Sequence, residues 1–533
     1  MSPRPSSWMQ PASWSLLCSP TFVSCPGARR GAASVVRRGP HPAPDRLRAR
    51  RCPGASVISV MRGARGVVVR SKILALVGAA ALGASLLAAS PLAGPAQAHV
   101  DDSAVVSAGS ARTGTAPARA EGTKNPWMPA TGGWFNDPWG LQEAKFRIER
   151  QIVAAINHAR KGSYIRIAVY SFDRVNVARA LLDAHKRGVR VQVLHNDHQY
   201  TTAMKMLKHG LGTNRGKKSW DYTCKTGCRS VQGVAHDKIY LFEHTGGAKN
   251  VVMTGSANLT GNAAIHQFND LLVKNDVPNL YARLLKLFWE LKKDKTANPL
   301  YQVDELRDYK LWVMPRPRNT RDRDPVIDIL RPVQCTGAGG GTGTNGRTKI
   351  RVSMHAWNGA RGSWIAERLR NLYAQGCDVK VLWALGGTEM KRVIGMNTPR
   401  GTVPRHTDSY NTDCDELQEV DMYSHQKYLT ISGHYGDDAS TSYVFTGSSN
   451  WTPSGISGDE MILRVKGPHL VNQWNRNFDF IWNHRSRPVG NSPGPAFYPT
   501  PPECEPTTTT TTPRARRATS TDLQFSGRYW EGD

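Results

Sequence analysis

One order of strand, helix and strand occurs twice in this chain, and it limits the folds that the chain can adopt. Each copy has two apolar runs of strand length around an amphipathic stretch that ends at a glycine. The first copy occupies residues 163–172, 175–188 and 189–195, and the second occupies 348–357, 363–376 and 378–385. Strands that alternate with helices form parallel βαβ units, so we expect two similar α/β halves, each a sandwich of a sheet and flanking helices.

Each copy is followed by the same two short motifs. The first half has His236-x-Lys238 and then Gly-Ser256-x-Asn258, and the second half has His425-x-Lys427 and then Gly-Ser448-x-Asn450. Of the 16 histidines only these two have a lysine at the second following position, and Gly-Ser-x-Asn occurs nowhere else. The repeated motifs therefore show that the two halves are duplicates. A repeated order of strand, helix and strand alone would not show this.

The residue types in these motifs suit a phosphodiester. Side chains two apart on a strand point to the same face, so each His and Lys pair should reach one cavity. If the halves pack about a pseudo-two-fold axis, both sets meet in one shared active site. One neutral histidine would attack phosphorus and the other, protonated, would donate to the leaving alcohol. The predicted ligands of the phosphate oxygens are Lys238, Lys427, Ser256, Asn258, Ser448 and Asn450.

Two carboxylates are predicted to orient the histidines. Asp270 lies 12 residues after Asn258, and Glu460 lies 10 residues after Asn450, each before an apolar strand. A carboxylate at such a place can accept the second ring N–H of a histidine and fix its tautomer. Asp459 is the close alternative to Glu460, and a surface charge at the start of a strand is the alternative for both positions.

The duplicated pattern resembles the phospholipase D superfamily over roughly residues 125–485. The resemblance implies that His236 is the nucleophile, that His425 is the general acid, and that a phosphohistidine intermediate forms. It also implies that the enzyme needs no metal and no other cofactor.

The chain departs from the family's pattern at one position and agrees with some of its members elsewhere. The family carries an acidic residue, usually Asp, five positions after the lysine, where Glu243 and Ser432 stand in the two halves. The stretch WFNDPWG at 134–140 and the pattern over 180–193 are similar to secreted actinobacterial members. A non-catalytic binding protein on the same fold is disfavoured, because both histidines and both lysines are intact.

The amino-terminal region has the features of an export signal. A basic stretch at 62–72, an apolar run at 73–89 and an A-x-A site ending at Ala98 predict a signal peptide over 61–98. The apolar run is shorter than the roughly 20 residues of a membrane-spanning helix, so we expect cleavage after Ala98 and a secreted protein rather than an anchored one. Residues 1–60 lie upstream of Met61, have no helical or strand periodicity, and are expected to be disordered, with an upstream-start artefact as one explanation.

Composition suggests where the remaining segments lie. The stretch 335–346 is rich in Gly and Thr, and the stretch after residue 486 is rich in Pro and Thr. We therefore expect a flexible segment 99–124, a first half 125–330, a Gly-rich linker 331–346, a second half 347–485 and a disordered tail 486–533.

Cysteines and charge bear on compartment and partner. Six cysteines follow residue 98, and an even number in an exported chain predicts disulfides, with 15 possible pairings. Cys224 and Cys228 are close enough to close a small loop. The first 98 residues carry 13 of the 70 Lys and Arg and one of the 42 Asp and Glu, so the remaining chain keeps a net charge of +16. This charge favours a partner that bears phosphate.

These observations predict a secreted phospholipase D, acting as a monomer on phospholipid at a membrane or vesicle surface. It would hydrolyse the distal phosphodiester of glycerophospholipids and could transfer the phosphatidyl group to other alcohols. The alternative is a secreted phosphodiesterase that cleaves nucleic acid with the same two histidines. Charge alone does not separate the two substrates.

Overall fold

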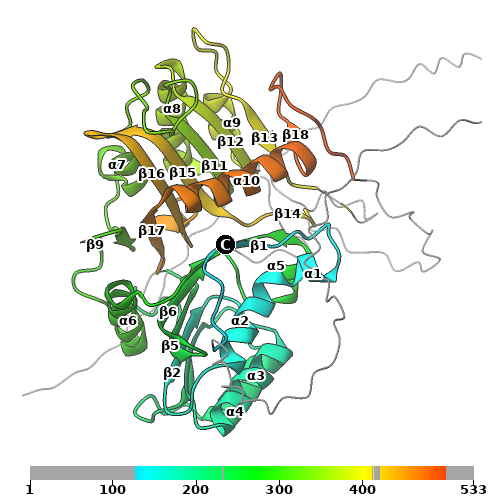
Figure 1. Ribbon diagram of the computed structural model, residues 1–533, viewed down its shortest axis with the longest axis vertical. Coiled ribbons are helices and arrows are strands. Elements are labelled where there is room, and N and C mark those ends of the chain that lie inside the picture. The colour runs from blue at the N-terminus through cyan, green and yellow to red at the C-terminus, as the bar shows by residue number, and fades with distance from the viewer. Residues whose placement is uncertain (1–125, 231–232, 411, 413–419, 500–533) are drawn as a thin grey trace, which may run out of the picture. The chain divides into compact units, whose positions relative to one another are not determined.

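The computed structural model describes residues 126–230, 233–410, 412 and 420–499. These residues form two α/β halves, each built on a mixed sheet (Figure 1). The expected signal peptide, the segments 1–60 and 99–124, and the cysteines Cys414 and Cys504 lie outside the described residues.

The first half is a seven-stranded sheet with the order β1-β8-β6-β5-β2-β3-β4. Strands β2, β3 and β4 are parallel to one another, and the other neighbours pair antiparallel. The strands are β1 (Gly132–Phe135), β2 (Tyr164–Val169), β3 (Arg190–Asn196), β4 (Trp220–Cys224), β5 (Ile239–Thr245), β6 (Ala248–Gly255) and β8 (Asp270–Lys274).

The second half is a nine-stranded sheet with the order β18-β13-β12-β11-β15-β16-β17-β10-β9. Its strands are β9 (Gln302–Leu306), β10 (Tyr309–Val313), β11 (Lys349–Trp357), β12 (Asp378–Gly386), β13 (Arg405–Thr407), β15 (Lys427–Tyr435), β16 (Asp438–Gly447), β17 (Met461–Lys466) and β18 (Arg487–Pro488). Without its two edge strands β9 and β18, this sheet repeats the first one strand for strand, and β11, β12 and β13 are again parallel. The two similar halves expected from the sequence are confirmed.

Helices cover the outer face of each sheet and lie between the two sheets. In the first half the outer core contains α2, α3 and α4, and in the second half it contains α7, α8 and α9. A central core joins residues of both sheets with α6 and α10. The helices are α1 (Gln142–Lys145), α2 (Arg147–Asn157), α3 (Val175–Lys186), α4 (Thr202–Leu211), α5 (Gly261–Ile265), α6 (Pro278–Lys293), α7 (Pro325–Leu330), α8 (Gly359–Ala374), α9 (Thr388–Ile394) and α10 (Pro468–His484), with 3₁₀ turns at Arg321–Arg323 and Ser454–Ile456.

The sequence pattern explains this layering. In β2, Ile165 and Ile167 pack into the outer core while Ala168 faces the central core, so the strand is apolar on both sides. In α3, Val177 and Leu181 form a buried stripe at helical spacing. Both α6 and α10 begin with proline in their first turn, where the missing N–H costs no hydrogen bond.

A third, two-stranded sheet joins the halves. Strand β7 (Gln267–Phe268) of the first half pairs in parallel with β14 (Tyr423–Ser424) of the second half. Because β14 directly precedes His425, this pairing fixes the backbone that carries the second histidine against the first half.

Three expected boundaries differ from the structure. Strands β9 and β10 fall within the expected first half 125–330, but β10 pairs with β17 in the second sheet. The reason is the repeat itself: β10 fills the place beside β17 that β1 fills beside β8, so the second half needs its own edge strand before its first helix.

The expected linker and tail are also more ordered than composition indicated. Within the linker 331–346, Thr342 Oγ1 donates to the carbonyl oxygen of Gly339 at 2.6 Å, and the N–H of Gly339 donates to the carbonyl oxygen of Ala439 at 2.8 Å. In the tail, residues 486–499 are described: β18 pairs with β13, and the ring of Phe497 packs against Trp139. Both segments fold because neighbouring strand edges offer hydrogen-bond partners that composition does not reveal.

Two disulfides are present among the described residues. Cys224 is bonded to Cys228, as the short spacing allowed, and Cys335 is bonded to Cys377. The second bond ties the start of the loop before β11 to the end of α8. None of the described helices has the length and the apolar run that crossing a bilayer requires.

Candidate active site

The two His-x-Lys motifs lie where the chain enters β5 and β15. His236 and Lys238 precede β5, His425 precedes β15, and Lys427 is the first residue of β15. The sequence indicated strands at these positions, and the backbone is extended there, but its partners come from the other half. The N–H of His236 donates to the carbonyl oxygen of Asp459 at 3.0 Å, and the N–H of His425 donates to that of Phe268 at 2.8 Å.

The lysines take the same position in both halves. Lys238 Nζ donates to the carbonyl oxygen of His236 and Lys427 Nζ to that of His425, each at 2.9 Å. All four side chains are buried, with exposed fractions of 4% or less. Ammonium groups held in so dry a site interact strongly with a phosphate that enters it.

Each histidine is oriented by a residue of the opposite half. His236 Nδ1 lies 2.8 Å from Oε1 of Glu460, and His425 Nδ1 lies 2.9 Å from Oδ1 of Asn269. With a proton on Nδ1 to satisfy these acceptors, the lone pair of each neutral imidazole is on Nε2. The two crossed hydrogen bonds bring both motifs into one shared site.

The expected role of Asp270 is wrong, because its carboxylate is bonded elsewhere. Oδ2 of Asp270 accepts from Thr446 Oγ1 at 2.5 Å and from Trp474 Nε1 at 3.3 Å. Burial raises the pKa of this carboxyl, and hydrogen bonds from its neighbours oppose the shift. The residue before it, Asn269, contacts the histidine instead, since successive side chains of an extended chain point to opposite faces.

The glycines of the Gly-Ser-x-Asn motifs show which residues of the two halves are equivalent. They also show why counting residues from the motif does not find Asn269. A Cβ atom at Gly255 would lie 2.3 Å from the carbonyl oxygen of Asp270, and one at Gly447 would lie 2.3 Å from that of Met461. Asp270 and Met461 are therefore equivalent positions in the two halves. The residues before them, Asn269 and Glu460, are equivalent as well, although their distances from the motif differ by one residue.

The serines of the motifs hold neighbouring backbone. Ser256 Oγ donates to Asn269 Oδ1 at 2.9 Å and accepts from the N–H of Asp270 at 3.0 Å. Its hydroxyl thus positions the amide that orients His425, which differs from the expected role as a phosphate ligand. Ser448 Oγ accepts from the N–H of Met461 at 3.1 Å, and phosphate binding by Ser448 stays a prediction.

The asparagines of the motifs are held in matching ways. Oδ1 of Asn258 accepts from the N–H of Ser171, and Oδ1 of Asn450 accepts from the N–H of Ala356, both at 3.3 Å. These bonds fix each amide, with Nδ2 as its donor end, beside the end of a central strand. Amide donors so placed fit the predicted phosphate contacts.

Two ring residues of the site were missed from the sequence. The ring of Tyr170 lies 4.8 Å from that of His236 and 5.3 Å from Lys238 Nζ, and the ring of His355 lies 4.7 Å from that of His425. Tyr170 directly follows β2 and His355 lies two residues before the end of β11, and the two positions are 185 residues apart. That shared offset was the signal that could have identified them.

A further histidine lies behind Tyr170. The ring of His198 stacks on that of Tyr170 at 3.9 Å, and its Nε2 lies 3.1 Å from Ser171 Oγ. Its Nδ1 lies 2.9 Å from Asn196 Oδ1. This stacking supports the ring of Tyr170, which contacts His236.

Buried carboxylates surround the first histidine. Oδ2 of Asp459 accepts from the backbone N–H of Arg229 at 2.8 Å, which makes Glu460 and not Asp459 the partner of His236. Burial raises the pKa of Asp459 to about 8. Burial, together with the neighbouring charge of Glu460, raises the pKa of Asp237 to about 7.

The residues five positions after the lysines face away from this chemistry. Glu243 Oε2 accepts from the N–H of Tyr164, at the end of β2 opposite to Tyr170, and Ser432 Oγ accepts from the N–H of Gly343. Neither residue contacts the histidines. In the described part of the chain, no group of three or more His, Cys, Asp or Glu side chains is arranged to hold a metal ion.

Comparisons with known proteins agree with the repeat. The family described as "Cardiolipin synthase, PLD-like domain" matches residues 152–292 and 344–482. No curated protein matches this sequence.

Solved structures with detectable similarity include three bacterial proteins. Phosphatidylserine synthase from Haemophilus influenzae Rd KW20 is 13% identical over 68% of this chain and 89% of its own, with a TM-score of 0.44. Nuc from Salmonella typhimurium, a phospholipase D family member, is 21% identical over 31% of this chain and 93% of its own, with a TM-score of 0.23. Polyphosphate kinase from Porphyromonas gingivalis is 12% identical over 66% of this chain and 51% of its own, with a TM-score of 0.43.

The two family matches together span more than half of the chain, and each contains one His-x-Lys motif and one Gly-Ser-x-Asn motif. The chain therefore belongs to the family of phospholipase D-like domains to which cardiolipin synthase gives its name.

Proposed function

We propose that this protein is a secreted phospholipase D that hydrolyses the distal phosphodiester of glycerophospholipids through a phosphohistidine. The crossed pair of hydrogen bonds is the observation that carries the proposal. It gives the two histidines different partners, a carboxylate for His236 and a neutral amide for His425. The two rings are thus prepared for different steps.

His236 is the proposed nucleophile. Its Nε2 attacks phosphorus while the bond from phosphorus to the head-group oxygen breaks. The imidazole gains positive charge when the P–N bond forms, and the carboxylate of Glu460 stabilises that charge through Nδ1. A neutral partner could not do so equally well.

His425 is the proposed general acid. In its protonated form it donates the Nε2 proton to the departing head-group oxygen, which leaves as an alcohol. Asn269 is a neutral amide, so its hydrogen bond to Nδ1 stabilises the protonated ring less than a carboxylate would. Neutral His425 then takes a proton from water, which attacks phosphorus, releases His236 and yields phosphatidate. Another alcohol in place of water would give transfer of the phosphatidyl group.

The amino and amide groups supply the electrostatic part of the mechanism. Lys238 and Lys427, which are buried, and the amides of Asn258 and Asn450 would hold the non-bridging oxygens while charge shifts in the transition state. Each of the four groups has its counterpart in the other half, so the phosphate would be held symmetrically between the halves.

A phospholipid substrate and an extracellular location are supported by separate observations. Cardiolipin, named in the description of the matching family, is a phospholipid. Disulfides are typical of exported proteins, and the described residues contain two. The basic stretch and apolar run before Ala98 add the features of a signal peptide.

Nucleic acid is the second candidate substrate, and one surface favours it. On the first half, Arg190 lies over the ring of Tyr164 at 4.9 Å, and Arg215 lies over that of Tyr222 at 3.8 Å. Lys292 lies 4.8 Å from the ring centre of Trp289. Interleaved basic and aromatic side chains are typical of surfaces that bind single-stranded nucleic acid.

One experiment separates the two substrates. Purified protein is offered mixed phospholipid vesicles and, in parallel, plasmid and single-stranded DNA in the same buffer, with His236→Ala as the control for contaminating enzymes. We expect head-group release and phosphatidate from the vesicles, and no release by the variant. Cleavage of DNA without lipid hydrolysis would replace the lipid by nucleic acid, and cleavage of neither by folded protein would contradict both.

A further inference from the structure

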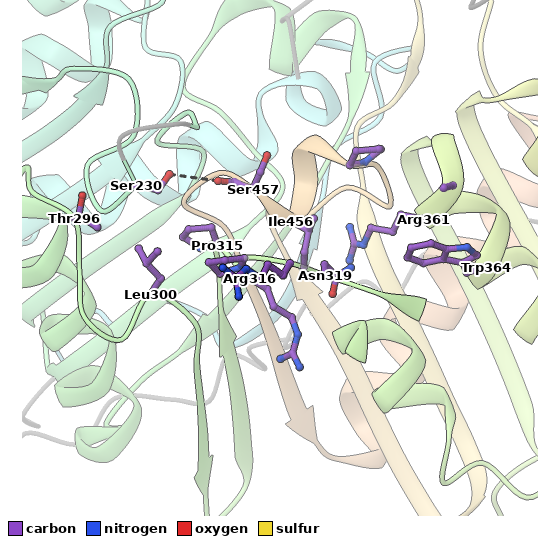
Figure 2. A pocket seen from close by; sticks show the side chains of 14 residues that line it. Ser230, Thr296, Leu300, Pro315, Arg316, Asn319, Arg361, Trp364, Ile456 and Ser457 are labelled. Carbon is purple, nitrogen blue, oxygen red and sulfur yellow. Dashed lines mark hydrogen bonds between the residues drawn. The ribbon is translucent and has the colours of Figure 1, made fainter. Parts of the chain in front are cut away.

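A cavity of about 680 Å³ lies outside the candidate active site and is lined mainly by the second half, with Ser230 and Thr296 also in its wall. It is bounded by the connector after β10, by the first turns of α8 and by the loop between Asn450 and Glu460 (Figure 2). None of the predicted site residues lines it. Its size falls within the roughly 300–1,000 Å³ of small-molecule sites.

A buried arginine in the cavity wall has a donor with no partner. Arg361 is 2% exposed, and its Nε donates to Asp324 Oδ2 at 2.8 Å. Nη1 donates to the carbonyl oxygens of Asn450 and Thr452. Nη2 is buried and has no hydrogen-bond partner. Figure 2 shows this guanidinium extending from the side of Trp364 toward Asn319.

Arg316 is a second arginine of the cavity wall that has a donor without a partner. Nε of Arg316 is buried without a partner, while its guanidinium lies 4.1 Å from the ring centre of Tyr301. A buried donor that bonds to nothing costs about 1–3 kcal/mol, and more when it is charged. Both donors belong to residues that line the cavity, so an oxyanion there would lie beside guanidinium groups that the described residues leave partly unsatisfied.

The charge of the cavity points to an anion. Arg316, Arg318 and Arg361 line it, and among the described residues only Arg361 has an ion pair, with Asp324. The cavity therefore keeps positive charge for which the described part of the chain supplies no counter-ion. Arginine suits oxyanions, since its planar fork can donate to two oxygens.

Much of the rest of the cavity wall is apolar. Its carbon surface comes from aliphatic, proline and indole groups, namely Leu300, Pro315, Pro317, Ala360, Trp364, Pro453 and Ile456. An inorganic anion alone would leave this surface uncovered. A ligand that has an apolar chain as well as an oxyanion would cover it.

We propose that this cavity binds one anionic amphiphile, with its phosphomonoester or carboxylate group against Arg316 and Arg361 and its apolar chain along Leu300, Trp364 and Ile456. The site is separate from the candidate active site, so the proposal does not rest on the proposed function. Because Arg361 also holds the carbonyl oxygen of Asn450, the occupied cavity would brace the loop that carries this asparagine.

The test is titration calorimetry of the full chain with dodecyl phosphate, below the concentration at which it forms micelles. Arg316→Gln removes one charge, and Ala360→Trp fills the cavity from an exposed helix position. Arg307→Gln, on the turn between β9 and β10 with a side chain 91% exposed, is the matched control for charge. Lys238→Met reports binding in the active site instead. Circular dichroism confirms that each variant is folded.

We expect one dodecyl phosphate to bind in the cavity of each chain. This binding should be weakened about tenfold or more by Arg316→Gln, lost in Ala360→Trp, and unchanged in Arg307→Gln and in Lys238→Met, which removes only binding in the candidate active site. Dodecanoate should bind at the same place, whereas inorganic phosphate and dodecanol should each bind at least tenfold more weakly. Equal binding by inorganic phosphate would overturn the amphiphile. Absence of saturable binding, or binding lost only in Lys238→Met, would overturn the site.

Discussion

Glu460 accepts a hydrogen bond from His236 at 2.8 Å, although the two residues belong to different halves of the chain. The reciprocal bond joins His425 to Asn269 at 2.9 Å. The halves are nearly equivalent in backbone and in motif, yet the acceptor is a carboxylate in one bond and an amide in the other. The chemical difference between the two histidines is therefore built into their partners.

The first prediction concerns Glu460. Glu460→Gln keeps an acceptor for His236 Nδ1 but removes the negative charge, so the positively charged phosphohistidine loses its stabilisation. We expect kcat to fall by about 100-fold, with a matching loss in the rate of phosphohistidine formation. Rapid-quench kinetics with the proposed phospholipid substrate measures both rates.

Asn269→Asp is the counterpart to this variant. A carboxylate beside His425 should hold the proton on that ring more tightly. We expect slower release of poor leaving groups and an alkaline limb of the pH–rate profile that moves to higher pH. Identical effects of the two variants would contradict the different roles assigned to the histidines.

The second prediction concerns which histidine becomes phosphorylated. His236→Ala should abolish both turnover and the covalent adduct, because no nucleophile remains. His425→Ala should block turnover of ordinary substrates but still form the adduct from a substrate whose leaving alcohol needs no proton. Mass spectrometry of acid-stopped reactions locates the phosphoryl group, and an adduct on His425 would reverse the two roles.

The third prediction is that catalysis needs no divalent metal. The charges that face the phosphate come from Lys238 and Lys427, and the nearby Glu460 is occupied by His236. Activity measured after dialysis against EDTA should equal that of untreated enzyme. Loss of activity that one added cation restores would show that the electrostatic assignment is incomplete.

The fourth prediction ranks the disulfides. Cys335 and Cys377 are 42 residues apart, whereas Cys224 and Cys228 are four apart, so the first bond constrains the unfolded chain more. Replacing both cysteines of a pair by Ser should lower the free energy of unfolding by about 4 kcal/mol for the long loop and about 2 kcal/mol for the short one. Urea denaturation measures both values.

Thiol titration complements this ranking. The denatured but unreduced wild-type protein should show no more than a trace of free thiol, because the cysteine count after residue 98 is even. Several free cysteines would contradict the expectation of an oxidising compartment.

The fifth prediction is a loss of stability with rising pH. Burial raises the pKa of Asp237 from 3.8 to about 7, so the folded protein retains a proton that the unfolded chain releases. The stabilisation is complete below pH 3.8 and is lost as pH rises toward 7. Asp237→Asn should reduce the fall in unfolding temperature between pH 5 and 8, with Asp408 and Asp459, whose pKa values burial also raises, contributing to the remaining slope. The control is Asp183→Asn, an exposed partner of Lys186, which should leave the slope unchanged.

The sequence predicted the architecture because the repeat and the periodicity report on local structure and burial. The strand and helix of the first repeat were recognisable from Ile165, Ile167, Val177 and Leu181, whose spacing matches the faces they bury. The boundary near residue 330 was not predictable in this way. Strand β10 belongs to the second sheet through its pairing with β17, and pairing between distant strands leaves no local pattern.

The prediction of the candidate active site had the same limit, because contacts between the two halves leave no local sequence pattern. The motifs identified His236, Lys238, His425 and Lys427, because a histidine with a lysine two positions later occurs only at these two places in the sequence. Asn269 was missed because a carboxylate was expected and because the two halves differ by one residue in that loop. A shift of one position in an extended chain moves a side chain to the opposite face, and only the packing of one half on the other shows which face meets the histidine.

The crossed hydrogen bonds also have a consequence for the cell while it synthesises the chain. A ribosome that has synthesised the first half has produced His236 but not Glu460, so the proposed nucleophile is not yet oriented in the nascent domain. A product truncated anywhere before Glu460 has the same defect. Under the proposed mechanism, hydrolytic activity arises only at the last stage of assembly, and we expect an incomplete copy to be inert toward the phosphodiesters of the cell that makes it.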